Sequence, residues 1–194
     1  SIFKQKNMKL LITVITALCF SLSTIQAQVK YPSIDKSNMD MAYYPPNYPL
    51  LKIQGKNTEP LTARVIYSRP HKNGRVIFGN LLEYGKVWRL GANEATEIEF
   101  FTDVKIGDTK VKKGRYTMYA IPGETEWTII INKDTDIWGS FKYDEKNDVV
   151  RIILPVQKLT DTKEDFSMVF TKADIGADLN IGWENVQISL PIVF

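Results

Sequence analysis

Residues 115–131, RYTMYAIPGETEWTIII, hold two runs of β-branched and aromatic residues separated by Pro122-Gly123. Short runs of this composition bounded by turn residues predict adjacent β-strands. From residue 61 onward the same period of two dominates, in the runs LTARVIY, ATEIEFF, DVVRIIL, EDFSMVF, ADLNIGW and VQISLPI. Eight or more strands with no ten-residue helical pattern predict an all-β fold, an antiparallel β-sandwich with jelly-roll or Greek-key connections. We expect a turn at Glu184-Asn185, between the last two strands.

The N-terminal stretch MKLLITVITALCFSLSTIQA begins with a positive charge at Lys9 and continues with an apolar run from Leu10 to Leu22. This pattern predicts a secretory signal peptide over residues 1–27, of which 1–7 are an upstream extension. The apolar run is shorter than the roughly 20 residues that span a bilayer as a helix. We therefore expect export to the periplasm or the cell exterior, with no permanent membrane anchor after cleavage following Ala27.

Removal of this segment changes the charge balance of the chain. The whole chain has 25 Lys plus Arg against 22 Asp plus Glu, and residues 1–27 contain three lysines and no acid. The rest is formally neutral, which argues against a nucleic-acid partner because such binding depends on clustered positive charge. The single cysteine, Cys19, lies in the same segment, so the domain depends on a buried core instead of disulfides.

Residues 28–60 differ in composition from the rest, because MAYYPPNYPLL interleaves three tyrosines with three prolines. Proline lacks an amide donor and disfavours helices and central strands. We expect an extended N-terminal arm whose tyrosines pack on the β-sandwich domain of residues 61–194, with Leu50–Gln54 forming an edge strand. A flexible linker is the alternative.

A long connection, residues 68–94, interrupts the rhythm of strands. It exceeds the roughly 12 to 15 residues of most structureless loops, and its large apolar residues argue against disorder. We expect it to be ordered over one end of the sandwich. A helical turn is predicted from Val76 to Tyr84, ended by Gly85, followed by a return strand that carries Val87 and Trp88.

The long connection also gathers polar and aromatic side chains that could line a site, namely Arg69, Arg75, Tyr84, Trp88, Arg89, Asn93 and Glu94. Arginine presents a planar fork of donors that suits bidentate pairing with a carboxylate. That carboxylate could belong to a ligand. Alternatively, Arg89 or Arg75 pairs with Glu94 and the cluster is a clamp that holds the connection to the sandwich.

Other candidate sites are weaker. His71 is the only histidine and follows a proline in a loop, which argues against zinc. The acidic segment NKDTDIWG spaces oxygen ligands like a calcium loop, but Ile137 occupies the position where glycine is required. We therefore predict neither a metal nor another cofactor. Three tryptophans could form a sugar-stacking platform or pack in the core: Trp127, Trp138 and Trp183.

Three stretches resemble a known family: IYSRPHKNGRVIFGNLLEYGKVWRLGANEATEIEF, KKGRYTMYAIPGETEWTIIINKDTDIWGSFKY and WENVQISLPI. They are similar to the secreted bacterial domain of unknown function DUF2911, which is typical of Bacteroidetes. The resemblance implies an exported β-rich domain. It supplies no activity, cofactor or catalytic residue.

These observations predict a noncatalytic binding module for a small polar ligand, such as a glycan or a carboxylate. One alternative is a hydrolase that uses Glu94 with Glu97 or Glu99 as a carboxylate pair. A purely structural or interaction domain with an Arg/Glu clamp is the other. The sequence indicates nothing about oligomeric state, and whether the protein is an enzyme stays open.

Overall fold

The computed structural model describes residues 2, 3, 5, 27–56 and 59–194 of the chain. The predicted signal segment, including Cys19, lies almost wholly outside these residues. Residues 34–194 form one compact unit, and residues 27–33 contain no helix or strand. In the described ranges no helix has the length and apolar character that crossing a bilayer requires.

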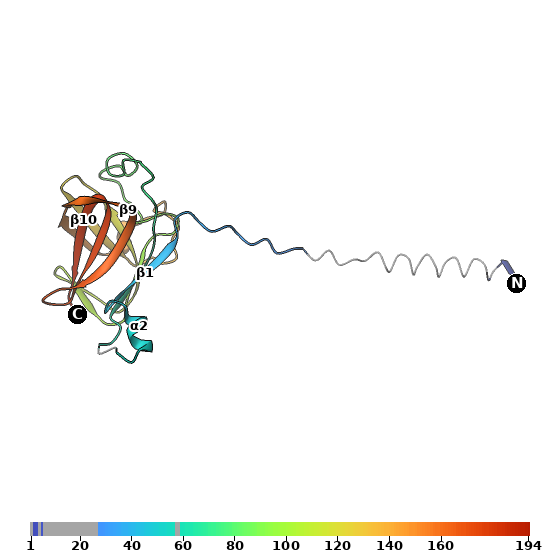
Figure 1. Cartoon of the computed structure of the whole chain (residues 1–194), viewed down its shortest axis with the longest axis horizontal. Coiled ribbons are helices and arrows are strands. Elements are labelled where there is room, and N and C mark those ends of the chain that lie inside the picture. The colour runs from blue at the N-terminus through green and yellow to red at the C-terminus, as the bar shows by residue number, and fades with distance from the viewer. Residues whose placement is uncertain (1, 4, 6–26, 57–58) are drawn as a thin grey trace. The chain divides into compact units, whose positions relative to one another are not determined.

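The first layer is an antiparallel sheet of six strands in the order β1-β2-β3-β6-β7-β8 (Figure 1). The hairpin predicted around Pro122-Gly123 is formed by β6 and β7, where Met118 faces Ile131 and Ile121 faces Thr128. The strands are β1 Met39–Tyr44, β2 Ala63–Ser68, β3 Glu97–Phe100, β6 Gly114–Ile121, β7 Glu126–Asn132 and β8 Asp148–Pro155.

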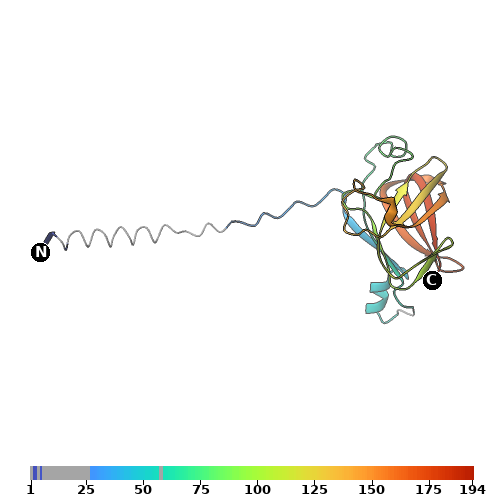
Figure 2. The same ribbon diagram turned by 180° about the vertical axis from the view of Figure 1, so that it is seen from behind.

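The second layer contains two long strands, β9 Gln157–Lys172 and β10 Ala177–Ile192, and the short hairpin of β4 Val104–Ile106 and β5 Thr109–Val111. Lys105 and Val193 exchange backbone hydrogen bonds of 2.8 and 2.9 Å, which attach β4 to the end of β10. The two layers are visible from both sides (Figures 1 and 2). The predicted antiparallel β-sandwich is therefore confirmed.

Strand β10 shows why this sequence forms a sandwich. Every second side chain of β10 is buried in the core in each of its two halves. The buried residues are Ala177, Leu179, Ile181 and Trp183 in the first half and Val186, Ile188, Leu190 and Ile192 in the second. The alternation changes phase at Glu184, which adopts a left-handed φ of 56° and breaks the register with β9. A bulge adds one residue and so keeps both halves facing inward. The turn predicted at Glu184-Asn185 is wrong, because this bulge lets one strand continue through it.

The N-terminal arm is more regular than predicted. Its residues 39–44 form β1, and the expected edge strand at Leu50–Gln54 is wrong because the helix α2, Tyr48–Ile53, occupies that position. The proline of the helix lies in its first turn, where an amide would have no partner within the helix. Tyr44 is buried, stacks on Phe194 with ring centroids 5.0 Å apart and donates a hydrogen bond to the carbonyl of Gly176.

The long connection and α2 lie at opposite ends of the sandwich (Figures 1 and 2). The core between them has at its connection end a cluster of aromatic rings contributed by both layers and by the connection itself. The rings are Tyr67, Phe78, Trp88, Trp127, Phe166 and Trp183.

Candidate functional site

The long connection is ordered without forming the helical turn predicted from Val76 to Tyr84. The amide of Leu82 donates to the carbonyl of Ile77 at 2.8 Å, across a wider turn than an α-helix has. Gly79 has a left-handed φ of 82°, and a Cβ atom there would lie 2.8 Å from the ring of Tyr84. The left-handed glycine interrupts the helix and lets the Tyr84 ring pack against the backbone.

The predicted return strand is reduced to a single bridge. Trp88 and Ala120, on β6, exchange backbone hydrogen bonds of 2.7 and 2.9 Å. This pairing turns the indole of Trp88 into the core, where it stacks on Trp183 with centroids 6.0 Å apart. The Nε1 atom donates to the carbonyl of Gly91, so the one polar atom of the buried indole is satisfied.

The end of the connection is attached to β2. The hydroxyl of Ser68 accepts a hydrogen bond from the amide of Ala92 and donates to its carbonyl. A Cβ atom at Gly91 would lie 2.7 Å from that hydroxyl, so only glycine allows this approach. The backbone around Arg89 is thus held on both sides, by Trp88 on β6 and by Ala92 on β2.

Arg89 is half-buried beside this fixed backbone. Its Nε atom is buried without a hydrogen-bond partner, and its guanidinium forms no ion pair within 4.0 Å in the part of the chain that the structure describes. Burial lowers the pKa of the Arg89 guanidinium, and no carboxylate offsets this shift. Arg64 also has a buried free Nε, but its guanidinium pairs with Glu99. Arg89 is therefore a half-buried cation with no carboxylate partner among the described residues.

Two adjacent cavities share Arg89 as a wall, and we call them together the arginine cradle. The larger, of about 270 Å³, is also lined by Arg75, and the smaller, of about 210 Å³, by Lys86 and Glu83. Both are lined by Leu81, Leu82, Trp88 and Arg89. The larger cavity has two arginines and no acidic side chain in its lining, so it suits a small anionic group.

Three of the seven predicted site residues thus line the arginine cradle: Arg75, Trp88 and Arg89. The guanidinium of Arg75 is exposed and donates from Nε to the carbonyl of Lys72 and from Nη2 to that of His71. These two bonds orient Arg75 while part of its fork stays free for a ligand. Leu82 and Lys86 are cradle residues that we did not predict, although both belong to the same connection.

The other predicted residues lie elsewhere. Arg69 pairs with Asp40 at 2.9 Å and donates to the carbonyl of Phe166 and the hydroxyl of Ser167, which makes it a clamp between β1, β2 and β9. Asn93 has a left-handed φ of 59°, and its carbonyl accepts from the amide of Gly139. Glu94 lines a separate cavity of about 180 Å³. Tyr84 packs on Gly79, outside the residues that line the arginine cradle.

The ion pairs differ from those expected of a clamp centred on Glu94. Neither Arg75 nor Arg89 pairs with Glu94 in the described residues. Glu97 pairs with Arg115 at 3.2 Å and accepts the amide of Asp136, while Glu99 is held by Arg64. Glu97 and Glu99 are thus each engaged by an arginine, which disfavours either of them as a general acid or base, and Glu94 lines the same cavity as Glu97.

The tryptophans and His71, which were also considered as site residues, lie outside the arginine cradle or pack in the core. Trp127 and Trp183 are buried in the core and Trp138 is 61% exposed, so the three tryptophans form no common platform. His71 pairs with Asp165 on β9. Among the described residues no group of three or more His, Cys, Asp or Glu side chains is arranged to hold a metal ion.

Comparison with known proteins gives one match. No curated protein and no solved structure matches the chain. The family model described as "Protein of unknown function (DUF2911)" matches residues 49–192, which include β2 to β10, the long connection and all residues shared by the two cavities of the arginine cradle. On this match the chain belongs to the DUF2911 family.

Proposed function

We propose that the protein is a noncatalytic binding module whose arginine cradle holds a small ligand by a carboxylate group. The observation that carries the proposal is the half-buried guanidinium of Arg89, whose Nε has no partner in the described residues. Burying a charge without a partner is costly, and groups of this kind in folded proteins call for an explanation. A ligand carboxylate that pairs with the accessible end of the guanidinium supplies the missing negative charge.

The chemistry of the cradle favours a carboxylate over a neutral glycan. A carboxylate matches the arginine fork in a bidentate manner, and Arg75 adds positive charge in the larger cavity, whereas Lys86 in the smaller one is accompanied by Glu83. A neutral sugar is usually stacked on an exposed aromatic face, but Trp88 and Trp183 are buried in the core with other rings packed against them. A sugar acid would therefore be held by its carboxylate and not by stacking of its ring on an aromatic side chain.

The proposal is tested by thermal unfolding of the full chain with acetate, lactate, succinate and glucuronate, each compared with its neutral amide or sugar. A ligand at 100 times its Kd adds about 2.7 kcal/mol and raises the Tm of a domain of this size by about 5 to 10 °C. We expect at least one carboxylate to do so and its neutral counterpart not to.

Two substitutions make the test specific. Arg89→Gln removes an unpaired buried charge, so it should leave the ligand-free Tm unchanged or higher while abolishing the ligand effect. A clamp residue would instead lower the ligand-free Tm. The control Arg115→Gln breaks pairs with Glu97 and Asp136 outside the cradle and should retain the ligand effect. Stabilisation that persists in Arg89→Gln, or a panel with no stabilising carboxylate, would contradict the proposal.

The proposal places this module outside the cytoplasm. It rests on the signal-like segment from Lys9 to Ala27, a positive charge followed by an apolar run and a small residue. Expression of the full chain in a Gram-negative host should yield a periplasmic or secreted form that begins at Gln28. An uncleaved cytoplasmic product would count against export without affecting the ligand experiment.

A further inference from the structure

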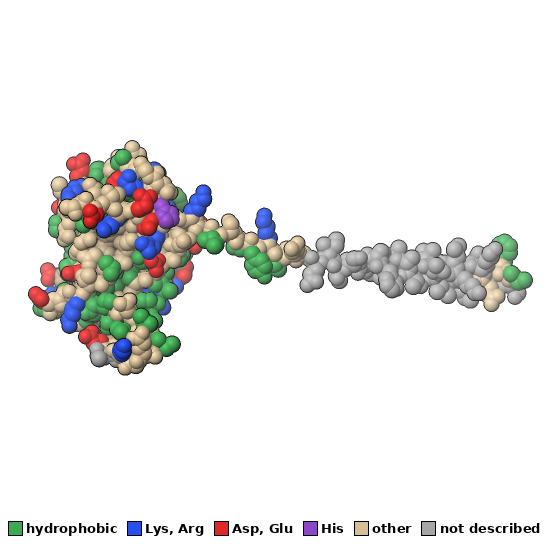
Figure 3. All heavy atoms as spheres, in the orientation of Figure 1, with side chains coloured by type: hydrophobic (Ala, Val, Ile, Leu, Met, Phe, Trp, Pro, Cys, Tyr) green, Lys and Arg blue, Asp and Glu red, His purple; other side chains and the backbone are tan. Residues whose placement is uncertain are grey.

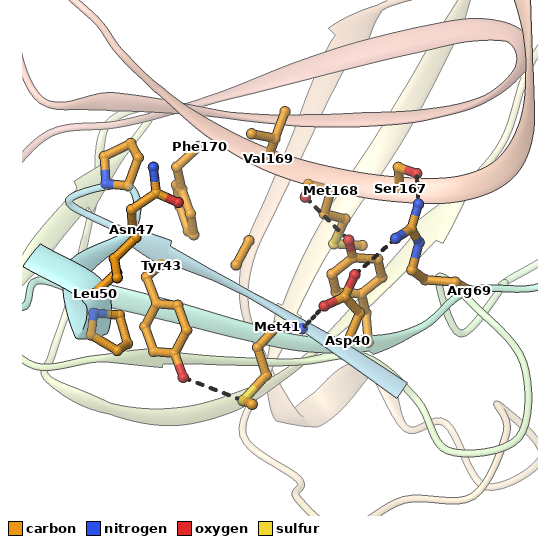
Figure 4. A pocket seen from close by; sticks show the side chains of 14 residues that line it. Asp40, Met41, Tyr43, Asn47, Leu50, Arg69, Ser167, Met168, Val169 and Phe170 are labelled. Carbon is orange, nitrogen blue, oxygen red and sulfur yellow. Dashed lines mark hydrogen bonds and ion pairs between the residues drawn. The ribbon is translucent and has the colours of Figure 1, made fainter. Parts of the chain in front are cut away.

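A groove larger than either cavity of the arginine cradle lies between the edges of the two layers, away from the cradle. It has a volume of about 480 Å³ and runs between β1 and β9, with residues near the start of α2 at one end (Figure 4). Strand β1 is one of the two edge strands of the first layer, and β9 pairs with β10 on one side and, at Asp165, with His71 of the long connection on the other. We call it the edge groove, and its lining includes Met41, Tyr43, Leu50, Tyr67, Val169 and Phe170.

The hydrogen bonds of β1 show which of its backbone groups face the edge groove. The carbonyls of Asn38 and Tyr44 accept hydrogen bonds from amides that flank or end β2. The backbone amides and carbonyls of the even-numbered residues of β1 therefore point toward β2. In an antiparallel pair the amide and carbonyl of one residue point to the same side, and successive residues alternate. The amides and carbonyls of Met41 and Tyr43 therefore point away from β2. The Met41 amide is bound by the Asp40 carboxylate, and Tyr43 has no ladder partner among the described strands.

The hydrogen bonds of β9 show the same for the opposite wall. The amide of Phe166 donates to the carbonyl of Pro70, and the carbonyl of Met168 accepts from the hydroxyl of Tyr67. The backbone groups of Phe166 and Met168 therefore point away from β10. By the same alternation the backbone of Phe170 also points away from β10, toward β1. Tyr43 and Phe170 thus present, from opposite walls, backbone donors and acceptors that have no partner among the described residues.

The charges in the edge groove neutralise each other at one end. Arg69 pairs with Asp40 and also binds Ser167 and the carbonyl of Phe166, which joins the two walls there (Figure 4). Toward α2 the lining is apolar apart from Asn47, and Met41 and Val169 are 49% and 53% exposed. Hydrophobic side chains also gather on the surface beside α2 (Figure 3). An occupant of this groove needs no charge, but it needs backbone-like donors and acceptors.

We propose that the edge groove binds an extended, uncharged peptide segment of a partner protein, apolar at alternate residues, which adds as a strand to the free edge of β1. An extended chain offers donors and acceptors at the spacing of a strand edge, and its alternate side chains can contact Met41 and Val169. A hydrocarbon chain would leave the groups of Tyr43 and Phe170 unpaired. A small anion would meet no free positive charge, because Arg69 is already paired with Asp40.

The experiment uses a phage-displayed library of ten-residue peptides selected on the full chain. We expect enriched peptides with apolar residues at alternate positions and few charges. Addition of a synthetic enriched peptide should slow amide hydrogen exchange in residues 41–44 and 168–172. Failure to enrich any peptide, or protection confined to the arginine cradle, would overturn the proposal.

Two variants test the geometry. Tyr43→Pro removes an amide that points away from β2, so it should leave the fold intact and weaken peptide binding by at least about tenfold, the equivalent of one lost hydrogen bond. The control Tyr43→Val keeps the amide and should bind within about threefold of the parent. If Tyr43→Pro does not fold, Val169→Lys places a charge in the groove and should weaken binding equally. Unchanged binding in Val169→Lys would overturn the proposal.

Discussion

The long connection and the N-terminal arm solve the same problem of packing a segment on the sandwich in opposite ways. The long connection contains no regular helix or strand, yet Ile77, Phe78, Trp88 and Leu90 are buried in the core. The arm contains the regular elements β1 and α2, yet no residue of α2 is buried. Regular backbone hydrogen bonding and anchoring in the core are thus separate properties of these two segments.

This difference indicates that folding stability depends more on the long connection than on α2. Burial of large side chains supplies most of the stabilising free energy of a domain, whereas a short exposed helix is marginal in water. The long connection is therefore an integral part of the core and α2 an attached surface element. Substitutions in the two segments should differ accordingly.

The largest effect is expected for Trp88→Ala in the long connection. The substitution empties the centre of the aromatic cluster and should lower the free energy of unfolding by about 3 to 5 kcal/mol, measured by urea denaturation. Trp138→Ala is the matched control, because the exposed Trp138 should change stability by no more than about 0.5 kcal/mol. Similar effects of the two substitutions would break the comparison.

An intermediate loss of folding stability is expected at alkaline pH from Tyr119, which packs against the end of the long connection. Tyr119 is buried against Ala95 and Val87, and desolvation, assisted by Asp134 and Asp148, raises its pKa to about 12. Because the folded-state pKa exceeds the unfolded value of 10, this stabilisation is complete below pH 10 and is lost as the pH rises from 10 to 12. The loss should approach about 1.4 kcal/mol per pH unit.

The variant Tyr119→Phe tests the assignment of this alkaline transition. It should show a smaller loss of stability between pH 10 and 12 than the parent, measured by denaturant titration at each pH. Tyr143, whose pKa is also raised by burial and by its hydrogen bond to Asp148, should account for part of the remainder. An alkaline transition identical to that of the parent would show that Tyr119 does not titrate as inferred.

The smallest effect is expected in the arm. Ile53, at the end of α2, is 84% exposed, so Ile53→Gln should change the free energy of unfolding by no more than about 0.5 kcal/mol. A loss above about 2 kcal/mol would mean that α2 is anchored in solution and would remove the contrast with the long connection.

The strands could be predicted where alternation and turns agree. Strands β2, β3, β6, β7 and β8 match their predicted runs closely. The short hairpin of β4 and β5 was not predicted as strands, because three residues on each side of Gly107-Asp108 are too few to show a period. The helix α2 was excluded on account of its proline, since composition does not show that this proline falls in the first turn. The turn predicted at Glu184-Asn185 is instead a bulge in which Glu184 adopts a left-handed backbone conformation, and the sequence does not distinguish the two.

The candidate site could be predicted only in part, because the sequence does not show which charged side chains pair in the folded protein. Sequence composition indicated that arginines and Trp88 gather in one connection, but not which arginine is already paired. Arg69 finds its partners on β1 and β9, more than twenty residues away in sequence, while Arg89 finds none in the described residues. Only the three-dimensional arrangement distinguishes the clamp from the free cation.

The continuity of β10 through its bulge determines where the polypeptide could be opened. A circular permutant with new termini at Glu184 would sever the ladder between the two long strands and detach Trp183 from the chain that follows it. The four-residue loop 173–176 between β9 and β10 has Asp174 and Ile175 exposed at its tip, so new ends or an inserted reporter are better tolerated there. For protein engineering, β9 and β10 are best treated as one continuous hairpin whose connecting loop is the place to open the chain.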